Sequence, residues 1–553
     1  MGQISANKNE GSGSSRILRI FDLLSSKRSI RFSVYLVSLS FFIIFILVPP
    51  LVGILQKFTR VWEIYKIPTL LERANNAILC SFLLAFIVST LDMIAGLPLA
   101  WFIVRSRSRL INIIDTFVDI PFLIPTAALG YSASLFWSKS QGLAGIFGME
   151  ELVPPGFMLV LLLHFIFSYP VIVRVMVGEL LNYTEIYEVA AKTLGAQPFT
   201  SIRTVTLPLL KPALVASFLL SFARSLSETG ATVMVAGQFE NGSVFIFNNQ
   251  DKECALVYVS LILITSSIIL FFLIKLIALK LKIPIRHAWP NLERKLSSHP
   301  TVKLRDSLTI AVFLLIVISP SIYVALPLIY ALENGTVNKA LAGIGPWSAY
   351  WSSISLSYSI GFISTVINIL AGLPMAILIA RRKAGQLSSL LDSIVNIPII
   401  VPSIALGVSL RFFWESVGFL NEFWVLILSH ATITYPYFVM SMSAAIMGID
   451  KEMEEVAFTL GAKPFTIFRR ITFPLTKYSV FSGAVLVFTR CVGETGAAKA
   501  AAKTLKTTPV LLVEWIIKGV VSPSESALGV GILILICFIV LLILRVLIRG
   551  GKR

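Results

Sequence analysis

The chain has 553 residues, of which 56% are hydrophobic and only 14% are charged, and its mean hydropathy is +0.85. A soluble globular protein carries about 25% charged residues, so this composition excludes that class and indicates an integral membrane protein. The formal net charge is +18. In a protein with many spans, a Lys/Arg excess marks cytoplasmic loops rather than a nucleic-acid site.

Apolar segments recur along the chain after a polar, basic N-terminal segment, residues 1–31. A membrane-crossing helix needs about 20 mostly apolar residues, and twelve segments satisfy this length. They are residues 32–55, 77–103, 111–137, 156–177, 211–235, 255–280, 307–330, 353–380, 388–415, 423–447, 479–500 and 525–548. The sequence therefore predicts an all-α integral membrane protein with about 12 transmembrane helices.

Lys and Arg cluster in every second loop, beginning with Lys27, Arg28 and Arg31. Because cytoplasmic loops are enriched in these residues, both termini are predicted to be cytoplasmic. The expected organisation is a first membrane domain (32–280), a cytoplasmic linker (281–306), a second membrane domain (307–548) and a short cytoplasmic tail (549–553). The chain is expected in the plasma or inner membrane.

The two halves repeat one another. Gly195 aligns with Gly461, 266 positions later, and the same offset carries "RSLSETGA" (224–231) onto "RCVGETGA" (490–497). Each half has an even number of spans, so the halves share one orientation, as in transporters built from parallel repeats. Upstream of the fourth span the offset becomes 277, which assigns 11 extra residues to the external loop after the third span.

A polar segment follows the fourth span of each half, "EVAAKTLGAQPFTSIRTVTLPL" in the first. Its residues predict a helix, a turn and a second helix, because Gly195 can end a helix in the left-handed conformation and Pro198 suits a first helical turn. Glu188, set against Lys192 and Arg203, places charge on both faces of this segment. Such a cytoplasmic knob is suited to docking on another protein.

The second copy, "EEVAFTLGAKPFTIFRRITFPL", resembles the EAA loop of binding-protein-dependent ABC importer permeases. The family pattern is an acidic residue, two small residues, a later glycine and a terminal Leu-Pro. In the first copy Val189 stands where the acid is expected, and in the second Phe473 replaces the Leu before the proline. The candidate ATPase-coupling residues are Glu188, Ala190, Ala191, Gly195, Pro198, Pro208, Glu454, Glu455, Ala457, Gly461, Pro464 and Pro474.

The resemblance implies a tandem-fused permease of the type I fold, whose two loops seat on two cytoplasmic ABC ATPase subunits and which receives substrate from an external binding protein. G-x-x-x-x-G-K-[ST], the phosphate-binding loop of such ATPases, is absent from this sequence. We therefore expect no catalytic residue and no cofactor in this chain, with ATP and Mg²⁺ held by the partner subunits. The four cysteines lack CxxC spacing and predict buried thiols, with neither a disulfide nor a metal site.

The fifth spans contain an Arg and a Glu four residues apart, and therefore on one helix face. The candidate path residues are Arg224, Glu228 and Thr229 in the first half and Arg490, Glu494 and Thr495 in the second. Intramembrane charges face a bundle interior or an aqueous cavity. Two interpretations stay open at this point: each pair neutralises itself and fixes helix packing, or it lines the translocation path.

Two resemblances point to different substrates. "ARSLSETGATVMVAG" resembles the fifth span of sulfate and molybdate permeases, whereas fusion of both halves in one chain is typical of ferric-iron and thiamine permeases. We expect an inorganic oxyanion of the sulfate, molybdate or tungstate type, with ferric iron, thiamine or a phosphonate as alternatives. An ion-coupled secondary transporter is the alternative from another class, and HExxH and Asp-Asp motifs of membrane enzymes are absent.

Prolines and one histidine recur at equivalent positions. Pro121 and Pro125, with their counterparts Pro398 and Pro402, fall inside the third spans and predict kinks, since each frees a backbone carbonyl. His164 and its counterpart His430 have no neighbouring ligand residues in the sequence. We interpret both as hydrogen-bonded packing residues.

Overall fold

The computed structural model describes residues 12–106, 111–140, 142–280, 290–323, 329 and 336–550. Parts of four predicted segments lie outside this set: residues 1–11 of the N-terminal segment, 281–289 of the linker, 324–328 and 330 of the seventh span, and 551–553 of the tail. Within the described ranges every regular element is a helix and no strand occurs. The predicted all-α class is confirmed.

The described residues contain nine helical segments long and apolar enough to cross a membrane, and three bent helix pairs that raise the total to twelve if each is one span. The nine are Arg28–Gln56, Pro68–Arg105, Phe157–Asn182, Glu253–Ile277, His299–Tyr323, Pro346–Ala380, Glu422–Met447, Pro464–Val492 and Pro523–Val540. The bent pairs are Ile111–Phe122 with Thr126–Ile146, Pro198–Leu209 with Lys211–Ser227, and Gln386–Ile400 with Ser403–Val417.

The third spans predicted at 111–137 and 388–415 are present as bent helix pairs, broken more sharply than the kinks expected from their prolines. In the second half, α24 (Gln386–Val395) and α25 (Ile397–Ile400) meet α26 (Ser403–Val417) at an angle of 101°. Val401 is extended and Pro402 immediately precedes α26. A residue before proline is pushed out of the helical region, which explains a break where the sequence predicted only a kink.

The fifth spans are also interrupted. α14 (Lys211–Ser227) ends before Glu228 and α15 (Gly230–Val235) begins after Thr229. α30 (Phe473–Val492) and α31 (Gly496–Ala501) repeat the break. The continuous helices predicted at 211–235 and 479–500 are therefore corrected to a long and a short helix separated by the Glu-Thr dipeptide.

The first span of each half packs on the other half. α2 (Arg28–Phe41), η1 (Phe42–Leu47) and α3 (Val48–Gln56) lie along α23 (Pro346–Ala380), α26 and α27 (Glu422–Met447). The Ser38 hydroxyl donates to the Ala371 carbonyl at 2.7 Å. Conversely, α19 (His299–Val312), η4 (Phe313–Ile318) and α20 (Ser319–Tyr323) contact α5 (Pro68–Arg105), α8 (Thr126–Ser138) and α10 (Phe157–Asn182).

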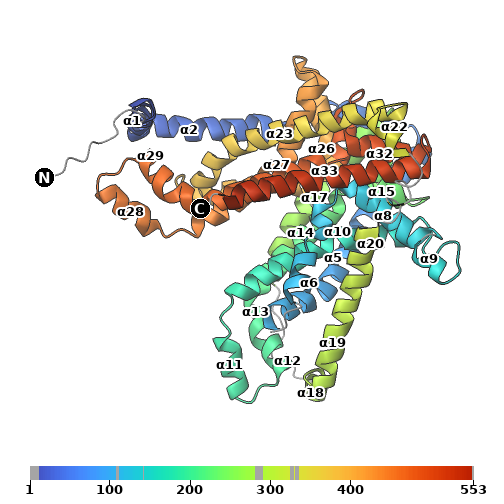
Figure 1. The fold of residues 1–553 in the computed structure, drawn as a ribbon, viewed down its shortest axis with the longest axis horizontal. Coiled ribbons are helices and arrows are strands. Elements are labelled where there is room, and N and C mark those ends of the chain that lie inside the picture. Colours follow the sequence, from blue (N-terminus) through green and yellow to red (C-terminus); the bar gives the residue numbers. More distant parts are fainter. Residues whose placement is uncertain are drawn as a thin grey trace.

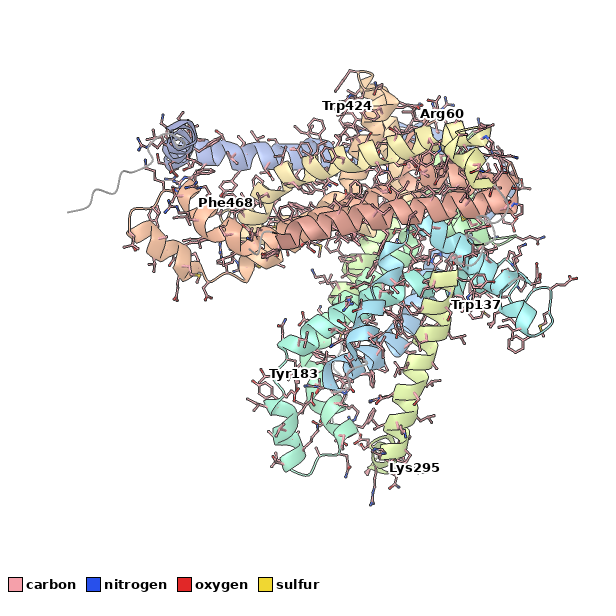
Figure 2. The ribbon with its side chains drawn as sticks, in the orientation of Figure 1. Arg60, Trp137, Tyr183, Lys295, Trp424 and Phe468 are labelled. Carbon is pink, nitrogen blue, oxygen red and sulfur yellow. The ribbon has the colours of Figure 1, made fainter. Side chains whose placement is uncertain are left out.

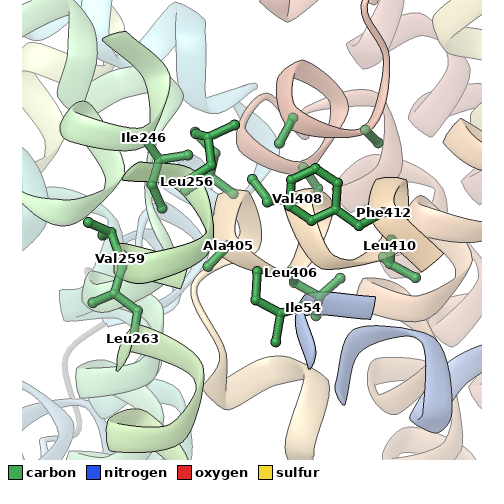
Figure 3. Close-up of a cluster of buried hydrophobic side chains, with 14 of the residues drawn as sticks. Ile54, Ile246, Leu256, Val259, Leu263, Ala405, Leu406, Val408, Leu410 and Phe412 are labelled. Carbon is green, nitrogen blue, oxygen red and sulfur yellow. The ribbon is translucent and has the colours of Figure 1, made fainter. Parts of the chain in front are cut away.

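The largest buried cluster joins the two halves (Figure 3). Ile246 of α16 (Gly242–Asn248) and Leu256 of α17 (Glu253–Lys280) belong to the same cluster as Leu406 and Phe412 of α26, and each is at most 1% exposed. Ile54 of α3 also belongs to this cluster. It lies in the first span, which packs on the other half and is called the exchanged span below. We call this contact between the two halves the seam. Lipid tails are as apolar as its side chains, so close packing rather than escape from water stabilises it.

The molecule divides into two arms away from the seam (Figure 1). One arm ends at α28 (Lys451–Thr459) and α29 (Pro464–Ile467), on the left, and the other ends at α11 (Ile186–Thr193), α12 (Pro198–Ser201) and α18 (Pro290–Leu296), at the bottom. α8, α15 and α32 (Thr508–Lys518) lie together where the arms join.

Gly53 provides a test of the exchanged first span. A Cβ at Gly53 would lie 1.9 Å from the Ser409 carbonyl oxygen, whereas a Cβ at Gly178 would meet no heavy atom within 4 Å. Gly53→Ala should destabilise the purified protein by about 1–3 kcal/mol through overpacking, measured as a lower thermal unfolding midpoint. Gly178→Ala, the matched control, should be neutral or slightly stabilising. Equal thermal unfolding midpoints for the two variants would contradict the packing of the first span on the second half.

Candidate functional site

Both predicted helix–turn–helix loops are present at the ends of the arms. α11 and α28 each end at a glycine in the left-handed conformation, Gly195 with φ +90° and Gly461 with φ +85°. Ala191 and Ala457 accept hydrogen bonds from the amides of Ala196 and Ala462, each at 3.0 Å. This pairing satisfies carbonyls that a helix end leaves open.

The other predicted loop residues occupy helix starts and ends. Pro198 and Pro464 begin α12 and α29, where their missing N–H groups cost nothing. The Ala190 carbonyl accepts from the Leu194 amide at 3.2 Å. Pro208 lies in the first turn of α13 (Leu207–Leu209), and Pro474 lies in the first turn of α30.

One carboxylate holds each loop against the end of the second span, buried in the first half and partly exposed in the second. Glu188 is 4% exposed, pairs with Arg105 at 3.0 Å and accepts from the Thr206 hydroxyl at 2.9 Å. In the second half, Glu454 pairs with Arg381 at 2.9 Å and accepts from Thr472 at 2.9 Å. The two carboxylates therefore make equivalent contacts and fix both loops in one geometry.

The acid of the family pattern has a different setting. The Glu455 side chain is 59% exposed and pairs only with Lys451, at 2.6 Å. Its counterpart Val189 is 53% exposed. The acid that organises each loop is thus one position earlier, so the departure at Val189 removes no internal contact.

Large apolar side chains cover the outer face of both loops. Leu194 is 89% exposed and its counterpart Leu460 is 82% exposed. The other exposed apolar residues of these loops are Ile186, Tyr187, Val189, Met453, Val456 and Phe458. Contiguous exposed apolar surface outside the bilayer marks an interaction site. The loop tips were identified from the sequence by their charges, and this apolar face was missed.

A helix outside the membrane-spanning segments packs on the second helix of each loop. α1 (Ser12–Ser26) contacts α29, where the Thr466 hydroxyl donates to Asp22 at 2.7 Å and the Phe465 amide donates to Ser25 at 3.1 Å. α18 contacts α12 in the same way, with the Phe199 amide donating to Ser297 at 3.0 Å. Each clasping helix directly precedes an exchanged first span, so it too joins one half to the other.

The two loops lie on separate arms. Figure 2 shows Phe468, next to α29, at the left and Tyr183, next to α11, at the bottom, with Lys295 of α18 at the tip of the lower arm. Any partner that grips both loops must therefore bridge the arms.

The intramembrane Arg–Glu pairs lie at the helix breaks on the seam. Arg224 pairs with Glu228 at 3.0 Å, and Arg490 pairs with Glu494 at 2.6 Å. Each glutamate also accepts from the amide three residues later, Ala231 at 3.3 Å and Ala497 at 3.0 Å. The pairs thus neutralise charge and cap the short helices, which gives them a packing role.

The same breaks bring the two halves into backbone contact. A Cβ on Gly230 would lie 2.4 Å from Thr495 Oγ1, and a Cβ on Gly496 would lie 2.6 Å from Thr229 Oγ1. Both threonine hydroxyls are buried and have no hydrogen-bond partner among the described residues. The Ser403 hydroxyl donates across the seam to the Ser227 carbonyl at 3.0 Å. This contact closes the space between the halves.

The two equivalent histidines are buried and hydrogen-bonded to neighbouring helices or to their own helix. His164 bridges the first break, with Nδ1 2.8 Å from the Ser225 hydroxyl and Nε2 2.9 Å from the Thr232 hydroxyl. His430 Nδ1 lies 2.7 Å from the Leu426 carbonyl. Within the described ranges no three His, Cys, Asp or Glu side chains gather as a metal site.

Three charged residues inside or at the edge of the predicted spans were missed from the sequence. Asp92, fully buried in α5, accepts from the hydroxyls of Ser168 and Ser221. Lys499 of α31 pairs with Glu514 at 2.7 Å. Arg411 of α26 is 5% exposed and its closest polar contact is Gln250, at 3.4 Å. Each of the three is a charged residue inside a predicted span or at its edge. A search of the sequence for charges within the spans would have identified them.

Comparison with known proteins agrees with this architecture. The family model described as "Binding-protein-dependent transport system inner membrane component" matches residues 92–283 and 372–551. The chain belongs to this family of ABC importer permeases, as two copies in tandem, and is a multi-pass membrane protein.

Its relatives lie in the sulfate and molybdate group. The chain is 28% identical over 237 residues to the molybdenum transport system permease protein ModB of Mycobacterium bovis, covering 39% of this chain and 85% of that protein. It is 32% identical over 245 residues to the sulfate transport system permease protein CysT of Salmonella typhimurium, covering 42% of this chain and 86% of that protein. CysT of Escherichia coli is also 32% identical, over 247 residues.

The two glutamates of the second loop should respond differently to neutralisation, because the Glu454 side chain is 22% exposed and the Glu455 side chain is 59% exposed. Glu454→Gln removes charge-assisted bonds worth about 1.5–3 kcal/mol, so amide hydrogen exchange in α28 should accelerate about tenfold or more. Glu455→Gln, the matched control one residue away, should leave exchange unchanged because its side chain is exposed. Equal exchange in the two variants would contradict the assignment of Glu454 as the organising acid.

Proposed function

We propose that this chain supplies both transmembrane halves of the permease of an ATP-driven importer, moving an inorganic oxyanion of the sulfate, molybdate or tungstate type. The observation that carries the proposal is the pair of loops built alike around Glu188 and Glu454, each presenting an apolar tip. One loop would seat on each of two ATPase subunits. Family membership supports this arrangement.

The proposed mechanism is alternating access. ATP binding closes the two ATPases and draws the loops toward each other, and the arms rotate about the seam. The Thr-Gly contacts of Gly230 and Gly496 separate on the side facing the external binding protein, and substrate enters. ATP and Mg²⁺ act on the partner subunits, and return to the starting state releases substrate into the cytoplasm, where both termini are placed.

The charges near the seam favour an anion. Arg411 is buried and makes no ion pair within 4.0 Å among the described residues, and the nearest carboxylates, on Glu415, Glu253 and Glu422, act on it only at longer range. An unpaired buried cation attracts an oxyanion and repels ferric iron. The names of the relatives, which specify molybdenum and sulfate, support the same choice. Thiamine and phosphonates stay as alternatives that transport measurements separate.

An ion-coupled carrier has one observation in its favour, the buried carboxylate of Asp92, which makes no ion pair among the described residues. Its counterpart in the second half is Asn368, whose amide donates to Thr434 at 2.8 Å. A neutral amide therefore serves at the equivalent position, and a hydrogen-bonding role accounts for both residues. The two coupling loops would have no use in such a carrier.

The docking role predicts the effect of charging both loop tips. Leu194→Glu with Leu460→Glu should weaken ATPase binding about 100-fold or more. Each leucine, once buried against the ATPase, would contribute about 1.5–3 kcal/mol to the binding free energy. Co-purification with the ATPase and ATP-dependent uptake should both be lost while the protein stays inserted. Ile146→Glu, in an exposed residue of α9 (Leu143–Ile146), is the control and should bind normally. Normal ATPase binding by the double variant would refute the loop assignment.

Substrate class is tested by uptake into proteoliposomes holding the permease, its ATPase and its binding protein. Radioactive sulfate or molybdate should accumulate only with ATP, and excess unlabelled oxyanion should compete. Arg411→Gln should lower uptake, and Arg411→Lys should retain more of it because the positive charge persists. Competition by ferric iron or thiamine, with none by oxyanions, would reject the oxyanion.

A further inference from the structure

A groove opens where α1 and α2 face the second coupling loop. It has a volume of about 840 Å³ and is lined by all of these elements together with the end of α23. Arg31, Arg381, Lys383 and Lys451 contribute positive charge, and Glu454 and Glu455 contribute negative charge. The groove lies at the end of the membrane-spanning part of α2 and α23.

An apolar trough continues this groove along the spans. It has a volume of about 530 Å³ and lies between α2 and α23. Ile30, Val34 and Pro374 line both spaces. Val37 and Leu370, 68% and 71% exposed, form the trough wall. A mostly apolar groove that carries charged side chains at the membrane boundary is thus joined to an apolar trough along the span.

Two of the four cations that line the groove have no ion-pair partner among the described residues. Glu454 pairs with Arg381 and Glu455 pairs with Lys451. Arg31 and Lys383 make no ion pair within 4.0 Å among the described residues, and Arg31 Nε is buried without a hydrogen-bond partner there. Burial lowers the pKa of Lys383, and of its charged neighbours Glu454 opposes this shift while Arg31, Arg381 and Lys451 add to it. The groove therefore holds a surplus of positive charge with no internal partner.

We propose that this groove and trough bind one anionic phospholipid, with its phosphate between Arg31 and Lys383 and an acyl chain along α2 and α23. The two unpaired cations attract the negatively charged phosphodiester of an anionic lipid. Continuity with the apolar trough favours a lipid over a free anion, since only a lipid fills both spaces. The proposed orientation places the site in the cytoplasmic leaflet.

The first half lacks one element of the site. Glu185 stands at the position equivalent to Lys451 and pairs with Arg105. A carboxylate there repels phosphate, so the site belongs to the second half alone. A bound lipid would lie against both α1 and α28, and it would link the bilayer to the coupling loop.

The test uses the full chain in nanodiscs of equal phosphatidylglycerol and phosphatidylcholine with identical acyl chains, followed by native mass spectrometry of the retained lipid. Phosphatidylglycerol should be retained preferentially. Arg31→Gln with Lys383→Gln should reduce that preference roughly 30-fold at low ionic strength, since each basic side chain contributes about fivefold. Lys303→Gln, a basic residue at the corresponding place before the seventh span, is the control and should have no effect.

Further variants separate the possible occupants. Leu370→Trp should displace both lipids by filling the trough, and inorganic phosphate should not displace phosphatidylglycerol. Equal retention of the two lipids by the unaltered protein, or an unchanged preference in the double variant, would overturn the proposal. Displacement by inorganic phosphate together with no effect of Leu370→Trp would assign the groove to a free anion. If deletion of residues 2–11 increased the amount of retained lipid without any headgroup preference, the N-terminal segment would be the occupant of the groove.

Discussion

A charge inside the bilayer must be neutralised, and this constraint shapes the centre of the molecule. The Arg224–Glu228 and Arg490–Glu494 pairs lie where the fifth spans break. Their glutamates satisfy the amides that the breaks leave open, as backbone at membrane depth requires. With the breaks so stabilised, Gly230 and Gly496 can approach the threonines of the opposite half. The seam therefore depends on two ion pairs, each joining the end of a long helix to the break that follows it.

Exchange of the first spans makes the two halves mechanically dependent. Each arm combines spans from one half with the first span of the other, and the preceding helix, α1 or α18, clasps the loop at the end of that same arm. A displacement at either loop is therefore transmitted to helices of both halves. Packed elements with discrete arrangements are the physical basis for such transmission. The largest buried cluster, which includes Ile54 and Leu406, lies where the arms join.

The sequence predicted the class of fold, the repeat and the helix–turn–helix loops, because hydropathy, internal alignment and the Gly and Pro positions are local signals. It did not predict the exchange of the first spans, since nothing in an apolar run specifies which neighbour it packs on. The breaks at Pro402 and Glu228 were read as kinks or missed, because the partners that satisfy a freed backbone come from distant residues. Contacts with distant residues also distinguish the adjacent acids: Glu454 is fixed by Arg381 and Thr472, whereas the motif residue Glu455 is exposed.

The central claim is that ATP brings the two loops together. Thr193 and Thr459 occupy equivalent exposed positions at the ends of α11 and α28. Spin labels at these sites, in a variant without the four native cysteines and in complex with the ATPase, would report the separation of the loops by pulsed electron paramagnetic resonance. We predict a shorter distance with a non-hydrolysable ATP analogue than without nucleotide. An unchanged or longer distance would contradict the proposed coupling.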